Sequence, residues 1–177
     1  MLRSARDLKF WGSNGYRHNT AAQRPLSVVA SFFPAVTQTA STGADPTVIG
    51  NPIATRSVIY ANGDSSQRVT VTVDEYACTG DALSAFQQAL QASQAVSGFS
   101  PIAVPNLGQQ TFAGTVTQSG ETHVGLGMLD GTLVIGVTLA GYDASSGNVN
   151  GLVSVAQIED TTAKTTLGIP LCFAAGT

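Results

Sequence analysis

The residues of this chain that could carry out nucleophilic chemistry are few. A catalytic Ser or Cys needs a base within hydrogen-bond reach, and the chain has two cysteines and two histidines. Cys78 stands just before a predicted helix, where the helix dipole would lower the pKa of a thiol. His123 would have to be its base, but nothing in their spacing brings the two together. We therefore assign no catalytic residue and interpret Cys78 as a small buried or disulfide-bonded cysteine.

Metal and phosphate chemistry have no stronger basis in the sequence. A structural zinc site needs four Cys or His ligands, whereas the chain beyond residue 24 offers three scattered ones, Cys78, His123 and Cys172. The glycine pattern G-x-G-x-x-x-G over residues 125–131 lies inside a predicted hairpin, so it lacks the helix N-terminus that binds a phosphate. We expect neither a metal ion nor a cofactor.

The charge distribution argues against a nucleic-acid partner. The chain has 8 Lys and Arg residues against 11 Asp and Glu residues, and five of the basic ones precede Pro25. The remainder offers only Arg56, Arg68 and Lys164 to a phosphate backbone. Charged residues make up 11% of the chain, against about 25% in typical soluble proteins. The polar surface is supplied instead by Ser, Thr, Gln, Asn and Gly, as is common in exported proteins and in subunits of assemblies.

The two cysteines also bear on the compartment. Cys78 and Cys172 have no metal-site spacing, but they could form one disulfide that ties the C-terminal tail to the body in an oxidising environment. No apolar run approaches the roughly 18 residues that a membrane-spanning helix needs. The sequence thus predicts a chain without a transmembrane segment, with a disulfide as an open alternative to two free thiols.

Residues 1–45 are predicted to form a basic leader or N-terminal arm with a short apolar segment at 25–36. Two interpretations of this region stay open. One is a secretory signal, although a proline ends the apolar run early and no A-x-A site follows. The other is a first helix packed on the sheet through Leu26, Val29 and Phe33.

Residues 46–177 are predicted to form a single α+β sandwich domain. The expected strands are 57–61, 67–74, 110–117 and two that form a hairpin over 121–139, and the expected helices are 82–96 and 149–167. The order is ββαβββα, which gives an antiparallel sheet of about five strands with helices packed on one or both faces. Residues 152–158 are rich in β-branched side chains, so an edge strand is the alternative there.

The hairpin over 121–139 is the sharpest local prediction. Asp130-Gly131 between alternating apolar runs is the strongest short-range hairpin signal, because a type I′ turn needs a positive φ at both positions. The pairs predicted by that turn are Met128 with Leu133, Leu126 with Ile135 and Val124 with Val137.

One face of this hairpin, which we call the glycine face, is the candidate binding site. Its members are His123, Gly125, Gly127, Gly136 and Thr138. Glycines in a strand mark a close approach by another element or an uncovered platform. A small, flat apolar or aromatic ligand or an extended partner segment could bind there. The alternative is that a helix, from 149–167 or from the N-terminal apolar run, packs over the glycines.

The order of these elements resembles a known family. The strand ending at Asp74-Glu75-Tyr76, the helix at 82–96, the loop at 104–108 and the strand at 130–137 look like the small exported lipoproteins and sensor-type domains of actinobacteria with a PsbP-like α/β sandwich. The resemblance covers about residues 56–168 and implies surface binding or accessory roles. Such lipoproteins carry lipid on a cysteine just after the signal, and this chain has none before Cys78. The resemblance therefore implies a soluble or secreted member.

We expect a non-enzymatic exported binding or accessory domain that acts through surface contacts, with a protein partner or a second copy of itself. Export to the cell surface, the periplasm or the medium is the expected location, and a cytoplasmic one stays open. One alternative is a structural subunit of a larger assembly, such as a phage particle or surface appendage, that docks through its N-terminal arm. Another is a small hydrolase or isomerase that uses His123.

Overall fold

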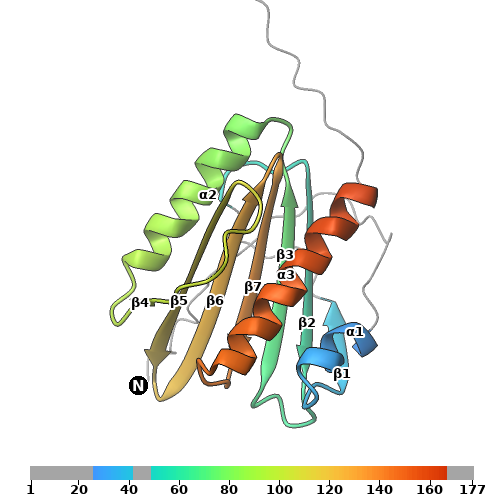
Figure 1. Cartoon of the computed structure of the whole chain (residues 1–177), viewed down its shortest axis with the longest axis vertical. Coiled ribbons are helices and arrows are strands. Elements are labelled where there is room, and N and C mark those ends of the chain that lie inside the picture. The colour runs from blue at the N-terminus through green and yellow to red at the C-terminus, as the bar shows by residue number, and fades with distance from the viewer. Residues whose placement is uncertain (1–25, 42–48, 167–177) are drawn as a thin grey trace, which may run out of the picture.

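The computed structural model describes residues 26–41 and 49–166, which form one seven-stranded antiparallel sheet and three helices (Figure 1). The strand order is β1-β2-β3-β7-β6-β5-β4. The strands are β1 (Gln38–Ser41), β2 (Ala54–Ala61), β3 (Arg68–Glu75), β4 (Ser100–Pro101), β5 (Gln110–Gln118), β6 (Glu121–Asp130) and β7 (Leu133–Ala140). The helices are α1 (Leu26–Phe32), α2 (Thr79–Gln94) and α3 (Ser146–Thr166). The predicted α+β class and ββαβββα order are confirmed, and β1 and β4 are short additions at the two edges.

The front face of the sheet, which lies under α3 in Figure 1, carries the larger core. Side chains alternate along a strand, so every second residue of β3, β6 and β7 faces α3. These residues are Val69, Val71, Val73, Val124, Leu126, Met128, Ile135, Val137 and Leu139. They pack against Leu152, Val155 and Ala156 of α3, and each large apolar side chain so buried contributes about 1.5–3 kcal/mol. The edge-strand alternative for residues 152–158 is therefore wrong.

The back face is partly covered by α2. Phe86 of α2, Tyr76, Leu129 and Val134 belong to a second core cluster, and Phe86 meets Phe112 edge to face with ring centroids 5.4 Å apart. The glycine face belongs to this side, because its residues alternate with front-facing neighbours. Since α1 and α3 both pack into the front core, the expectation that one of them covers the glycines is wrong.

The turn between β6 and β7 lies one residue later than predicted. Its central residues are Gly131 and Thr132, and Gly131 alone has a positive φ, +62°. A glycine with positive φ at the first central position is typical of a type II′ turn rather than type I′. The Thr132 carbonyl also accepts a 2.9 Å hydrogen bond from the backbone N–H of Tyr76, a contact from outside the hairpin. The observed pairs are Met128 with Ile135, Leu126 with Val137 and Val124 with Leu139. Partners shift by two residues, so each side chain keeps its predicted face.

The N-terminal apolar run forms α1, and Val29 and Phe33 are buried in the front core. A Cβ added at Gly151 of α3 would lie 2.9 Å from the Phe33 ring, so this glycine lets α1 approach α3 closely. Residues 1–25 lie outside the described residues. The secretory-leader interpretation and the division of the chain at residue 45 therefore stay predictions.

Candidate ligand pocket

The five residues of the glycine face do come together in space. Gly127 pairs with Gly136 and Gly125 pairs with Thr138 across β6 and β7. His123 precedes Gly125 by two residues on β6 and therefore points to the same face. The three glycines are buried, whereas His123 and Thr138 are half-buried. A ligand platform at this face stays a prediction.

His123 lies in a small group of charges at the end of that face. Its Nε2 is 3.4 Å from Glu121 Oε2, and Arg68 Nη2 is 3.2 Å from Glu121 Oε1. Glu121 thus lies between two basic side chains, of which Arg68 comes from β3. These pairs are partly exposed, so each contributes at most about 1 kcal/mol. These contacts place His123 beside the partly exposed ion pair of Arg68 and Glu121.

Cys78 occupies the N-cap position of α2, with extended backbone angles and no side-chain capping bond. Its sulfur is disulfide-bonded and does not titrate, which agrees with the structural interpretation of this cysteine. Cys172 lies outside the described residues, so the pairing of Cys78 with Cys172 stays a prediction.

The described part of the chain has neither a metal-binding cluster nor a membrane-spanning helix. No group of three or more His, Cys, Asp and Glu side chains in residues 26–41 and 49–166 could hold a metal ion. Nor does any helix in those ranges combine the length and the apolarity that crossing a membrane requires.

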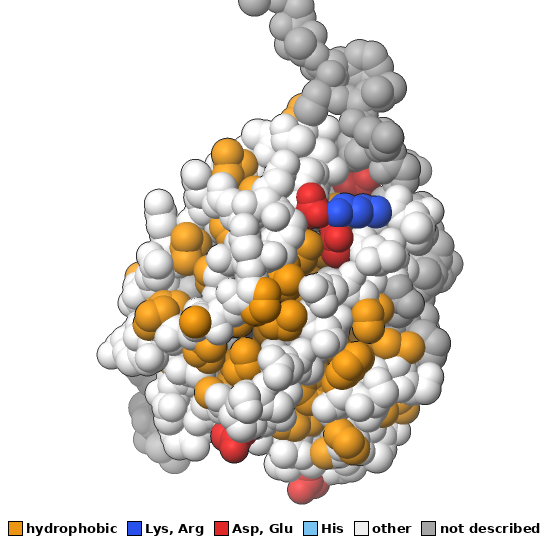
Figure 2. All heavy atoms as spheres, in the orientation of Figure 1, with side chains coloured by type: hydrophobic (Ala, Val, Ile, Leu, Met, Phe, Trp, Pro, Cys, Tyr) orange, Lys and Arg blue, Asp and Glu red, His pale blue; other side chains and the backbone are white. Residues whose placement is uncertain are grey.

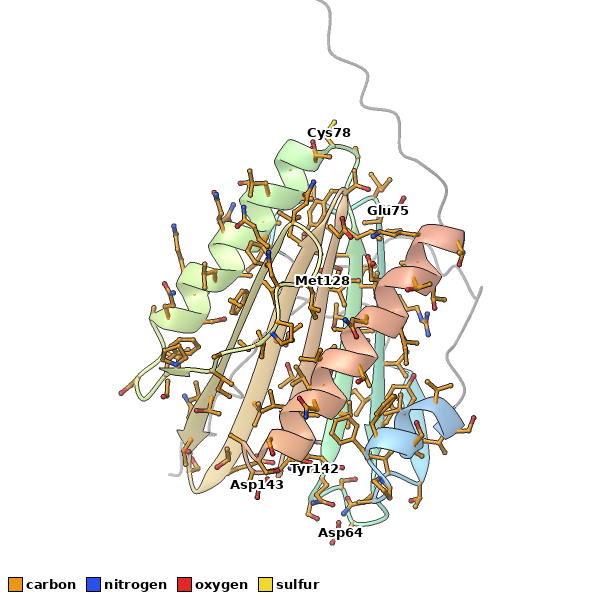
Figure 3. The ribbon with its side chains drawn as sticks, in the orientation of Figure 1. Asp64, Glu75, Cys78, Met128, Tyr142 and Asp143 are labelled. Carbon is orange, nitrogen blue, oxygen red and sulfur yellow. The ribbon has the colours of Figure 1, made fainter. Side chains whose placement is uncertain are left out.

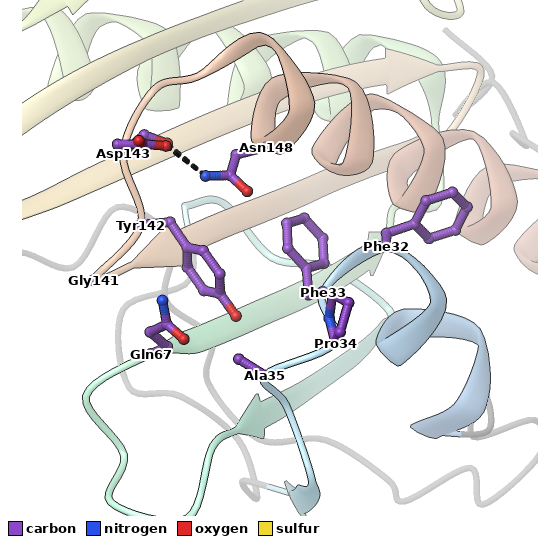
Figure 4. Close-up of a pocket in the computed structure, with 9 residues that line it drawn as sticks. All are labelled: Phe32, Phe33, Pro34, Ala35, Gln67, Gly141, Tyr142, Asp143 and Asn148. Atoms are coloured by element: carbon purple, nitrogen blue, oxygen red, sulfur yellow. Dashed lines mark hydrogen bonds between the residues drawn. The ribbon is translucent and has the colours of Figure 1, made fainter.

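A cavity of about 400 Å³ opens where α1 ends and α3 begins (Figure 4). It is lined by residues 32–35 after α1, Gln67 beside the start of β3, residues 141–143 after β7, and Asn148 in the first turn of α3. Its volume lies within the roughly 300–1,000 Å³ range of small-molecule sites. Three regions far apart in the sequence, at residues 32–35, 67 and 141–148, therefore build one pocket.

Gly141 fixes the loop on the β7 side of this pocket. Its φ is +75°, and an added Cβ would lie 1.9 Å from the carbonyl oxygen of Ser66. Its backbone N–H donates to the carbonyl of Thr122 at 3.1 Å. Because only glycine fits this conformation and this space, Gly141 determines how the chain leaves the sheet for α3.

Asp143 forms hydrogen bonds with the residues that follow it at the start of α3. Its Oδ1 accepts hydrogen bonds from the Ser145 backbone N–H at 3.2 Å and from Asn148 Nδ2 at 2.7 Å. Such a short side-chain bridge is typical of the residues that precede a helix. The bonds from Ser145 and Asn148 lower the pKa of Asp143, so its side chain is a carboxylate at neutral pH.

Tyr142 is the buried polar residue of the pocket. Only 8% of it is exposed, and its ring meets Phe33 edge to face at 5.4 Å. Figure 4 shows the ring projecting toward Ala35, beside Gln67. The hydroxyl is buried and has no hydrogen-bond partner in the described part of the chain, and burial raises its pKa, which keeps it protonated. A buried hydroxyl without a partner has lost its hydrogen bonds to water, so an occupant that pairs with it would gain affinity.

The fold and the pocket define an α+β domain with a central antiparallel sheet and a concave site at one end. No protein-family model matches the chain, and no curated protein matches it. Its fold is similar to that of the extracellular domain of PknH from Mycobacterium tuberculosis, with a TM-score of 0.54 and 12% identity over 76% of this chain and 91% of that chain.

A second similar structure is LpqN, a protein involved in cell envelope biogenesis of the same organism. It aligns with a TM-score of 0.37 and 12% identity over 68% of this chain and 88% of that chain. That TM-score is too low to support an inference. The likeness to the PknH domain confirms, at the level of fold, the resemblance to exported actinobacterial sensor-type domains.

Proposed function

We propose that this chain is an exported, non-enzymatic binding domain, and that it recognises a small ligand in the pocket between α1 and the β7–α3 loop. The shared fold with an extracellular domain supports export. The contacts of His123 and the disulfide at Cys78 support a role without catalysis, since they engage the two side chains best suited to it.

The observation that carries the proposal is the Tyr142 hydroxyl. Buried hydroxyls in folded proteins are nearly always paired, and an exception calls for a physical reason. This hydroxyl belongs to a residue that lines a cavity with aromatic walls and an ionised carboxylate at the rim. Aromatic walls with a few convergent polar groups are a usual composition of a ligand site.

Protein-observed NMR with a fragment library on the full chain tests this function. We expect some fragments to shift the side-chain amide of Asn148 and the backbone amide of Gly141. Ala35→Phe should abolish those shifts, because Ala35 is exposed and lines the cavity, so a larger side chain fills it from one wall.

The matched control is Ala92→Phe, which adds the same group at an exposed position of α2. It should leave the fragment shifts intact. Shifts that survive Ala35→Phe, or a library without any fragment that perturbs these amides, would contradict the proposed pocket. Mass spectrometry of the mature N-terminus after secretion tests export separately.

A further inference from the structure

The charge in the lining of the pocket is negative. Asp143 lines the cavity, and none of the described residues that line it is Lys, Arg or His. Asp64 lies at the same end of the molecule (Figure 3), on the turn whose Ser66 carbonyl abuts Gly141. Hydrogen bonds from Ser66 lower the pKa of Asp64, so it too is ionised. Figure 2 shows acidic but no basic side chains at this lower end of the visible face.

An anionic ligand is therefore disfavoured here, even though α3 begins at the pocket. A helix N-terminus attracts anions, but Asp143 already supplies a carboxylate to the Ser145 N–H and to Asn148. The Asp143 side chain is exposed, so its carboxylate can also be reached by a cation. A second anion would meet Asp143 with no basic side chain in the lining to offset the repulsion.

The wall opposite Asp143 is aromatic. Phe32 is the more exposed of its two phenylalanines, at 36%, which is unusual for a side chain of this size. Phe33 and Tyr142, whose rings meet edge to face, also line the cavity. Aromatic faces attract organic cations, and they also cover the apolar part of a ligand.

We infer that the pocket takes a small organic ammonium ion that carries an apolar group. The ammonium faces Asp143, and the apolar group covers Phe32 and Pro34. This inference rests on the proposed function and adds the chemical class of the ligand. It joins two features that are otherwise unrelated: the carboxylate at the rim and the exposed Phe32.

Three probes of one shape test the charge preference. Phenethylamine is a cation at neutral pH, phenethyl alcohol is neutral and hydrocinnamate is an anion, whereas the ring and the chain are nearly the same. Each is titrated into the full chain while the Asn148 side-chain amide is followed by NMR. We expect the cation to bind about tenfold more tightly than the alcohol, from an ion pair and a cation–π contact, and the anion to bind most weakly.

Asp143→Asn separates charge from shape. The asparagine keeps an oxygen that can accept from Ser145, but it removes the carboxylate, so the cation should lose most of its advantage over the alcohol and keep only the part that comes from the cation–π contact. The control is Asp81→Asn, an exposed acid in the first turn of α2, which should leave the preference for the cation intact.

Two results would overturn the ammonium assignment. If the alcohol or the anion binds at Asn148 as tightly as the cation, the pocket remains a binding site for another class of ligand. If none of the three probes shifts Asn148, the assignment also fails, and the Ala35→Phe experiment with the wider library then decides separately whether the pocket binds anything.

Discussion

The polar side chains at the two ends of α3 differ in whether they are paired within the fold. Toward its C-terminus, Glu159 Oε2 lies 3.7 Å from Arg56 Nη1, and Lys164 contacts two carboxylates. Toward its N-terminus, the Tyr142 hydroxyl has no partner among the described residues, and Asp143 lines a cavity. Polar groups that are paired inside the fold hold the helix on the sheet. Those left at a cavity are available to something that binds.

The contrast has one exception within the described residues. Asp160 Oδ1, near the C-terminal end of α3, is also buried without a partner. Its other oxygen accepts a 2.8 Å hydrogen bond from Lys164, which also pairs with Asp130. The carboxylate as a whole is therefore neutralised by a neighbouring charge, which the Tyr142 hydroxyl is not.

The largest effect is expected from Gly141→Ala at the N-terminal end. The change forces a Cβ against the Ser66 carbonyl in a left-handed conformation, so we expect a loss of about 3 kcal/mol in the free energy of unfolding. Urea denaturation measures it. Gly147→Ala is the control, since nothing lies within 4 Å of the added Cβ. Equal losses in the two variants would show that the Gly141 loop is not held as described.

Arg56→Met tests the paired end. Glu159 is 3% exposed and Arg56 is 25% exposed, so removing the cation leaves a buried carboxylate and should cost about 2 kcal/mol. Adding Glu159→Gln should restore part of that loss, because the double variant no longer buries the carboxylate that Arg56 faced. Denaturant unfolding of the two single variants and the double variant measures the coupling. Strictly additive losses would mean that the two side chains do not interact.

Much of the fold could be predicted because its signals are local. Val69, Val71 and Val73 alternate with polar residues, and Leu83, Phe86 and Leu90 recur at helical spacing, so their elements follow from short stretches of sequence. The register of the β6–β7 hairpin could not, because the hydrogen bond from Tyr76 to Thr132 joins residues far apart in the chain. Strand β4 was also beyond prediction, since two residues ending in a proline carry no periodicity.

The pocket escaped sequence analysis for a related reason. It combines segments around Phe33, Gln67 and Tyr142 that only the assembled sheet brings together. A local signal did exist, since Asp143-x-Ser145 just before a helix is typical of a helix start. That pattern places α3, but it gives no indication that Tyr142 would be buried without a hydrogen bond.

Removing an ionisable group should change the melting temperature at neutral pH in opposite directions at the two ends of α3. Burial raises the pKa of Glu75 above its ordinary 4.5, near the C-terminal end of α3 (Figure 3). Its contribution to stability is full below pH 4.5 and is lost as the pH rises through the raised pKa. Glu75→Gln should therefore raise the melting temperature at pH 7 and leave it little changed at acid pH.

Asp143 should behave in the opposite way. Its pKa is lowered by hydrogen bonds from Ser145 and Asn148, so its contribution is present above the ordinary value of 3.8 and is lost as the pH falls through the lowered pKa. Asp143→Asn should thus lower the melting temperature at pH 7 but not at acid pH. Melting curves of the two variants that shift in the same direction at neutral pH would contradict the assigned environments.

The smallest effect is expected from deleting the Tyr142 hydroxyl. The hydroxyl of Tyr76 donates a 2.7 Å hydrogen bond to the carbonyl of Ile49, so Tyr76→Phe should destabilise the fold by about 1 kcal/mol. Tyr142→Phe removes a group that has no such bond, so its free energy of unfolding should be unchanged or slightly higher, within about 0.5 kcal/mol. Urea denaturation of both variants makes the comparison. If Tyr142→Phe costs as much as Tyr76→Phe, the hydroxyl is paired within the protein, and the pocket end of α3 is as fully satisfied as the other.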